Sequence, residues 1–465
     1  GARGPTSLNN TNFLDTIGEK WTELGELTGI GERMHYLLGL RNRKKYIEEE
    51  KFLDEKFNPH QMLIYSTAVN RTLVSCASQL QGWYPQRAQM GKVLTPEQEK
   101  KSYPPILEGN EDKYKNIIEE LNNSSLPYRM ILAPIRMYEE SELYMNLQTK
   151  GECINKLYGL VKGNEKKKEI SDYIEIYNEN YAKNLSNFYN NTKSMFGLEE
   201  IGSIYGDFIC DYTEDREMSE FKSKTGINLT VFFKDCLEFK DIYYSNFLYG
   251  DKDNILAHLI SNKSMRQFLF YMKRKLKAII NKKDDDTNYA DYSRPRLVMN
   301  SGHDVTLAAD LMFLFKLLNI NITENFNFPR FASQFAIEVR KNKENCTKFS
   351  DFNIIGDYNG KIIFNMTVEF FLEKIENEIW TEDKLNDFCG IIPNNNNDNT
   401  NNEDNSDKKL KIYKIIIIVL ISFSVIFIVI IIILACKLCK KKDSWISPLN
   451  QNLEPDENNI DTINH

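Results

Sequence analysis

The sequence predicts an α/β domain that carries a helical insertion and is followed by one transmembrane helix. Three observations lead to this prediction. Strand-like runs that lead into helix-like runs occur near residues 63–75 and again near 296–318. Residues 95–251, between them, are rich in Glu, Lys, Tyr and Asn and show long helical patterns with few strands. Ile415–Cys436 is apolar and free of charge. Alternating strand and helix signals typify α/β domains, so the helical middle is interpreted as an insertion.

The first α/β region is marked by three segments. Leu24–Lys45 has apolar residues at helical spacing, which predicts a helix. Leu63–Ser66 is a short apolar run of the kind that forms a buried strand. Arg71–Ser75 follows it closely and predicts the start of a second helix.

The second α/β region begins at Arg296. Leu297–Met299 predicts a strand, and Val305–Leu318 predicts the helix that follows it. Phe335–Arg340 alternates apolar and polar residues, as a half-buried strand does. Phe352–Phe364 predicts a hairpin that turns at Asn359-Gly360, because this dipeptide favours two-residue turns.

The composition divides the chain into four parts. A domain at 1–392 is followed at 393–411 by an Asn-rich stalk, which has too few apolar residues to fold. Residues 412–436 are long and apolar enough for a helix that crosses a bilayer. A short polar tail occupies 437–465. Lysines flank the apolar run on both sides, so the charge distribution does not decide its orientation.

Charge and cysteine content limit the partners and the compartment. The net charge of −7 excludes the basic face of a nucleic-acid binder. Cysteines without zinc-ligand spacing, beside a membrane anchor, favour disulfides in an oxidising compartment, although buried free thiols are the alternative. We therefore expect a single-pass membrane protein with its large domain in a lysosome or vesicle lumen or outside the cell, and a short cytoplasmic tail. The six cysteines that precede the apolar run are Cys76, Cys153, Cys210, Cys236, Cys346 and Cys389.

Three short motifs contain residues suited to phosphate chemistry. Arg3 lies in Gly1-Ala2-Arg3-Gly4-Pro5, where glycines allow close backbone approach and a guanidinium matches phosphate. Arg71 begins a helix after a buried strand, a position suited to anion binding. His303-Asp304 follows an apolar strand and offers a phosphate donor and a general acid. Taken singly, a frayed terminus and a surface arginine in a capped helix are the better explanations of the first two motifs. For the third, the alternative is a helix cap with an incidental histidine, although an apolar strand rarely ends in a histidine by accident.

Taken together, the motifs resemble the histidine acid phosphatase family. Gly1 to Pro5 is similar to the end of the family's R-H-G-x-R-x-P motif. Ser66 to Thr72 is similar to S-x-x-x-R-T, and Ser301 to Thr306 contains H-D-x-T. The resemblance covers most of 1–392 and is weakest in the helical middle. It implies a phosphoglycerate-mutase-like fold, with a mostly parallel sheet, helices on both faces, and a helical cap at 95–251 over the phosphate site.

The resemblance also implies a mechanism and residue roles. A histidine nucleophile forms a phosphohistidine, Arg3, Arg71 and His303 bind phosphate, and Asp304 protonates the leaving group. No metal or cofactor is required. The family's leading Arg and the nucleophilic His would fall directly before Gly1, so we expect the sequence to be truncated there. Ala68 replaces an Asp that is common in the family, which puts the hydrogen bonding around Arg71 in doubt.

The leading prediction is hydrolysis of small phosphate monoesters by an acid phosphatase. The alternatives are a membrane-anchored, non-catalytic protein of the same fold, and a phytase or lysophosphatidate phosphatase of the same family. The predicted partners are the substrate, the bilayer and, in a homodimer, a second copy of the chain.

Overall fold

The computed structural model describes twelve parts of the chain, all in the unit Gly1–Ile392. The second unit, Pro393–His465, lies outside the described residues, and the predicted stalk, spanning helix and tail lie there with it. The described parts are 1–5, 21, 24–85, 91–102, 104–107, 113, 115–138, 167–188, 194–216, 218–249, 255–281 and 295–390.

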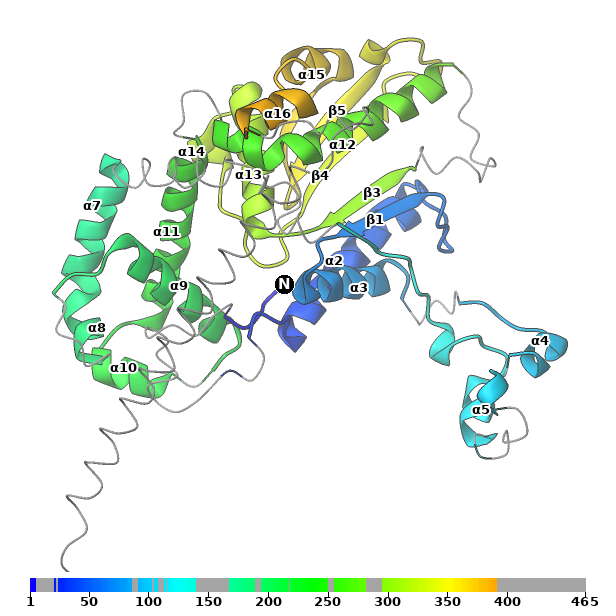
Figure 1. Cartoon of the computed structure of the whole chain (residues 1–465), viewed down its shortest axis with the longest axis horizontal. Helices are drawn as coiled ribbons and strands as arrows, with labels where there is room; N and C mark the ends of the chain where they lie inside the picture. Colours follow the sequence, from blue (N-terminus) through cyan, green and yellow to red (C-terminus); the bar gives the residue numbers. More distant parts are fainter. Residues whose placement is uncertain are drawn as a thin grey trace, which may run out of the picture. The chain divides into compact units, whose positions relative to one another are not determined.

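A three-stranded parallel sheet forms the first layer of the α/β region. Strand β1 (Met62–Ser66) is central, with β2 (Arg136–Met137) on one side and β3 (Leu297–Ser301) on the other. Strands so far apart in sequence are joined by crossovers, which allow parallel pairing. Ser66 pairs with Ser301, so β1 and β3 end level with each other (Figure 1).

The last three strands form a separate antiparallel sheet in the order β4-β5-β6. They are β4 (Phe335–Lys341), β5 (Phe352–Tyr358) and β6 (Lys361–Thr367). Asn359 and Gly360 have φ values of 52° and 90°, as a two-residue hairpin turn requires, which confirms the predicted hairpin. The α/β class is confirmed, but the expected mostly parallel sheet describes only β1 to β3. The connections between β4, β5 and β6 are too short for crossovers, so these strands pair antiparallel.

Helices cover both sheets. Apolar side chains of α3 (Asn70–Trp83) pack with those of β1. Helices α12 (Ile255–Ile280), α13 (Asp304–Leu317) and α15 (Val368–Ile375) pack with β5 and β6 around a second buried cluster. These contacts bury the apolar faces that the sequence pattern indicated. The remaining helices outside the helical middle are α2 (Gly29–Arg43), α14 (Ile322–Asn325), α16 (Glu382–Phe388), the π-helical Lys44–Glu49 and the 3-10 turn Phe349–Asp351.

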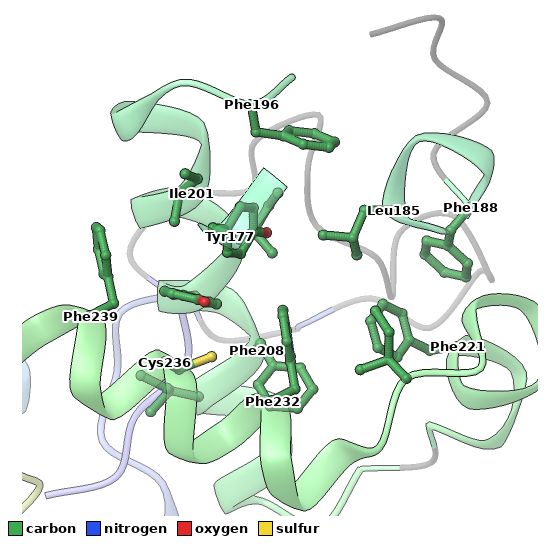
Figure 2. Close-up of a cluster of buried hydrophobic side chains, with 14 of the residues drawn as sticks. Tyr177, Leu185, Phe188, Phe196, Ile201, Phe208, Phe221, Phe232, Cys236 and Phe239 are labelled. Carbon is green, nitrogen blue, oxygen red and sulfur yellow. The ribbon is translucent and has the colours of Figure 1, made fainter. Parts of the chain in front are cut away.

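The helical middle has its own core (Figure 2). This core is rich in aromatic side chains, and Tyr205, Phe208 and Phe232 make edge-to-face ring contacts within it. Such pairs add specific geometry to the burial of apolar area. Its helices are α7 (Lys168–Tyr177), α8 (Lys183–Phe188), α9 (Leu198–Thr213), α10 (Ser219–Thr225) and α11 (Leu229–Tyr249). The same region includes α4 (Pro96–Lys100), α5 (Lys115–Leu121), the π-helical Asn178–Ala182 and the 3-10 turns Pro105–Leu107 and Pro127–Arg129.

The membrane predictions require correction. In the described ranges, no helix combines the length and the apolar character that a bilayer crossing needs. Helix α12 has 26 residues but carries lysines and arginines, and the apolar α13 has only 14 residues against the ~20 that a span requires. The predicted transmembrane helix at 412–436 lies outside the described residues, so the single-pass location and the bilayer partner have no support from the described helices.

The predicted disulfide framework is also corrected. Cys76, Cys210, Cys236 and Cys346 are free and buried. Cys236 lies in the aromatic core of the helical middle, where burial raises the pKa of its thiol well above 9.0. These four cysteines act as small apolar side chains. Cys389 differs, since it is disulfide-bonded.

The close contact between α2 and α3 depends on Gly39 and Gly82, which face each other across it. A Cβ on Gly39 would lie 2.0 Å from the Gln79 carbonyl oxygen, so Gly39→Ala forces the helices apart. We expect it to destabilise the fold by ~1–3 kcal/mol, measured as the free energy of unfolding. Gly206→Ala in α9 is the matched control, because no atom lies within 4 Å of its Cβ position. The control should be neutral or stabilising, and equal destabilisation by both variants would contradict the packing.

Candidate active site

Strands β1 and β3 end at the same level, so two of the predicted motifs, Ser66 to Thr72 and Ser301 to Thr306, lie at one edge of the sheet. The backbone N–H of Thr67 donates to the Ser301 carbonyl at 3.2 Å, which extends the pairing one residue beyond the strands. The Ser301 hydroxyl then donates to the carbonyl of Thr72 in α3 at 2.9 Å. These bonds fix the residues that follow β1 relative to those that follow β3.

A hydroxyl network holds the imidazole of His303 at this edge. Thr67 Oγ1 lies 3.2 Å from His303 Nε2 and 2.7 Å from Thr72 Oγ1. The Thr72 hydroxyl in turn donates to the Val69 carbonyl at 2.7 Å. Thr67 and Thr72 are buried, so their geometry is set by packing as well as by hydrogen bonds. The ring of His303 is thereby oriented from the segment that carries Arg71.

Two helices begin at the same edge. Helix α3 starts at Asn70, so Arg71 lies in its first turn. Helix α13 starts at Asp304, with His303 as its N-cap residue. The unpaired N–H groups and the dipole of a helix N-terminus favour anions. Both helices therefore add positive potential to the arginine and histidine side chains.

The segment Gly1–Pro5 is fastened to the start of α2. The N–H of Gly4 donates to the Glu26 carbonyl at 3.0 Å, and the N–H of Thr28 donates to the Ala2 carbonyl at 3.1 Å. Arg3 and Leu27 form an isolated antiparallel bridge. This pairing holds the Arg3 backbone in place beside α2.

All four predicted site residues line one cavity of about 1730 Å³, together with Gly1. The charges of Arg3, Arg71 and Asp304 all act on the Gly1 nitrogen. The charges of these three side chains therefore act at one position in the cavity. The structure brings Arg3, Arg71, His303 and Asp304 together, and their individual roles stay predictions.

Three further residues at this cavity were not found from the sequence. His35 of α2 lies 2.7 Å from the Gly1 amine, through Nε2, and burial lowers the pKa of the ring to about 3. Lys240 of α11 and Asp310 of α13 also line the cavity. His35 and Lys240 reach the cavity only through tertiary packing, so no local pattern marks them. Asp310 lies six residues after Asp304 on an apolar helix. A carboxylate on an otherwise apolar helix is a signal in the sequence that could have identified it as a candidate site residue.

The same cavity runs along the free edges of both sheets. Residues of β3 and β4 line it, and each strand is the last in its sheet on that side. Apolar side chains of both strands, such as Val298 and Ile337, are only half-buried, whereas those of β1 are mostly buried. Among the described strands, neither edge has a further pairing partner, so both edges present backbone groups and apolar side chains to a common space.

No three His, Cys, Asp or Glu side chains in the described parts of the chain are grouped so as to hold a metal ion. The cavity instead gathers guanidinium, imidazole and ammonium groups together with the carboxyl groups of Asp304, Asp310, Glu50 and Glu338. Groups of this kind bind oxyanions directly.

A family model described as histidine phosphatase superfamily (branch 2) matches residues 8–352. The chain belongs to this family. The match includes Arg71, His303 and Asp304, while Arg3 lies before its first residue.

Curated relatives in this family are similar over short stretches. Lysosomal acid phosphatase of Xenopus laevis is 41% identical over 61 residues, which cover 13% of each chain. Prostatic acid phosphatase of Homo sapiens is 43% identical over 84 residues, 18% of this chain and 21% of that protein. Lysophosphatidic acid phosphatase type 6 of Bos taurus is 33% identical over 94 residues, 20% and 22% of the two chains. Each match thus spans less than a quarter of the relative's length.

Solved structures of phytases are also similar. The phytase of Klebsiella sp ASR1 is 13% identical over 77% of this chain and 80% of its own, with a TM-score of 0.45.

The buried carboxyl group of Asp310 makes the stability of the folded protein depend on pH. Burial raises its pKa from 3.8 to about 7, although the Ser264 hydroxyl donates to it at 2.7 Å and opposes this rise. An acid with a raised pKa binds its proton more tightly when folded, so stability falls as the pH rises from about 4 to 7. We expect Asp310→Asn to flatten this dependence and to raise the melting temperature at pH 7. The exposed Asp172→Asn is the control, and an Asp310→Asn protein with the wild-type pH profile would contradict the assignment.

Proposed function

We propose that this protein is an acid phosphatase that hydrolyses phosphate monoesters through a phosphohistidine intermediate. The observation that carries the proposal is the convergence of Arg3, Arg71, His303 and Asp304 on one cavity at the ends of β1 and β3. Family membership adds support, because the same motifs define the site of histidine acid phosphatases. The acid phosphatases among its relatives favour this substrate class.

In the proposed mechanism, Arg3, Arg71 and His303 bind the phosphoryl oxygens of the substrate. Their charges, with the N-termini of α3 and α13, stabilise the negative charge that develops during transfer. A histidine nitrogen attacks phosphorus as the ester P–O bond breaks, and Asp304 gives its proton to the departing oxygen. Water then attacks the phosphohistidine, its proton passes to Asp304, and the P–N bond breaks to release inorganic phosphate.

The attacking histidine is proposed to be the residue joined to Gly1 in the full-length protein. Gly1 lies in the cavity, so the residue attached to its nitrogen would lie there too. The resemblance to R-H-G-x-R-x-P puts a histidine at that position. The free edges of β3 and β4 also support this arrangement, since a strand that leads to Gly1 could pair with both.

Activity of the full-length protein tests the proposal. The protein with its natural residues before Gly1 should hydrolyse 4-nitrophenyl phosphate best at acidic pH. Arg71→Ala and His303→Ala should each lower kcat by about 10² to 10³-fold, because each removes a donor to the transferring phosphoryl group. The exposed Arg33→Ala on α2 is the control and should keep full activity. An inactive protein that still binds phosphate would favour the non-catalytic alternative.

The role of Asp304 is tested by changing the leaving group. Asp304→Asn should slow hydrolysis of glycerol 2-phosphate by about 10² to 10⁴-fold, because an alkoxide needs a proton to depart. Hydrolysis of 4-nitrophenyl phosphate should fall far less, since its phenolate is stable without one. The ratio of the two kcat/KM values is the measurement. An equal loss on both substrates would mean that Asp304 is not the proton donor.

A further inference from the structure

Lys240 is a cation of the cavity that belongs to none of the phosphate motifs. It lies on α11, in the helical middle of the chain, and is half-buried. It lines the cavity together with Arg3 and Asp304. A lysine thus reaches the candidate site from the helical middle of the chain, outside the three motifs.

The surroundings of Lys240 fix its position. Its Nζ lies 5.4 Å from the centre of the Phe328 ring. Phe328 is stacked on Tyr244 with ring centres 4.1 Å apart, and its backbone N–H donates to Asp241 Oδ1 at 2.6 Å. The aromatic face on which Lys240 rests is therefore held by α11 itself, and it supports the cation.

The neighbouring carboxylate does not neutralise Lys240. Asp241 accepts a hydrogen bond from Arg330 Nη2 at 2.8 Å, so its negative charge is paired with Arg330. Among the residues that the structure describes, none forms an ion pair or hydrogen bond with the ammonium group of Lys240. Burial lowers its pKa, and Asp304 opposes this change. A partly buried cation that forms no ion pair or hydrogen bond is unfavourable, and an anion bound in the cavity would relieve this.

The position of Lys240 relative to Asp304 indicates which part of a substrate it meets. Helix α11 packs against α13, the helix that begins at Asp304, because Tyr244 contacts the buried cluster to which Ala308 and Leu311 belong. Lys240, one turn before Tyr244, lines the cavity together with Asp304. In the proposed mechanism Asp304 protonates the leaving oxygen, so a cation that enters the cavity from the helix packed on α13 lies on the leaving-group side of the phosphorus atom.

We propose that Lys240 binds an anionic group on the leaving group of the substrate. The preferred substrates would then be phosphate monoesters that carry a second negative charge, a carboxylate or another phosphate, close to the ester oxygen. This inference rests on the proposed phosphatase function and adds a specificity-determining residue to it.

Two matched substrates test the proposal in the full-length protein. Phosphoglycolate and 2-hydroxyethyl phosphate differ only in that a carboxylate replaces a hydroxymethyl group. The wild type should prefer phosphoglycolate. Lys240→Met should lower kcat/KM for phosphoglycolate about tenfold to a hundredfold, the range of a hydrogen bond to a charged group, mostly through KM. It should change kcat/KM for 2-hydroxyethyl phosphate by less than about threefold, which is well below that range.

Control variants separate charge from structure. Lys240→Arg keeps the charge and should keep the preference. Lys234→Met changes an exposed lysine on the same helix and should leave kcat/KM for both substrates unchanged. Melting temperatures show whether Lys240→Met is folded, and Lys240→Gln replaces it if it is not.

The possible outcomes are distinct. A wild type that hydrolyses none of 4-nitrophenyl phosphate, phosphoglycolate and 2-hydroxyethyl phosphate would overturn the proposed function and this inference with it. A wild type that hydrolyses only 4-nitrophenyl phosphate would overturn the inference alone. A wild type that hydrolyses both matched substrates without preference would overturn the inference alone. An equal loss on both substrates in Lys240→Met would assign Lys240 to the scissile phosphate, which also overturns it, as would the absence of any effect.

Discussion

The parallel pairing of β1 with β3 is the constraint on which the candidate site depends. The register runs from Met62 opposite Leu297 to Ser66 opposite Ser301, so both strands end at one level. A shift by one residue would turn every side chain of the strand to the other face. The contact between Thr67 and His303 would then be lost, as would the bond from Ser301 to Thr72. The positions of Arg71 and His303 at one edge follow from this register.

The rest of the site is fixed relative to that edge by separate contacts. The segment Gly1–Pro5 pairs with the residues before α2, which brings Arg3 to the cavity. Helix α11 contributes Lys240 from the helical middle. Cations from three distant segments therefore line the same cavity as Asp304. This arrangement suits a dianionic ligand, because no single segment could supply enough positive charge by itself.

Much of the α/β region could be predicted from the sequence because its signals are local. The apolar run before Ser66 and the one before Ser301 each form a strand, and each is followed by the expected helix. The Asn359-Gly360 turn was equally readable, since few dipeptides adopt two positive φ values. The site residues lie directly after these strands, so their approximate location followed from the same signals.

Other features depend on packing between distant segments and were not predictable. The antiparallel sheet that begins with β4 was expected to belong to a mostly parallel one. His35 and Lys240 meet the cavity through the packing of α2 and α11, which no local pattern encodes. The buried free thiols were expected to pair, because the count of cysteines says nothing about the distance between them. The membrane prediction depended on one apolar segment outside the described residues, and no described helix supports it.

The most direct measurement is a crystal structure of the full-length protein with vanadate bound. Vanadate adopts the geometry of a transferring phosphoryl group, so its oxygens report which side chains bind that group. The account predicts that vanadate lies at the ends of β1 and β3, with its oxygens in contact with Arg3, Arg71 and His303 and with Asp304 beside the apical oxygen. Vanadate bound away from this edge, or in contact with only one of these segments, would contradict the account.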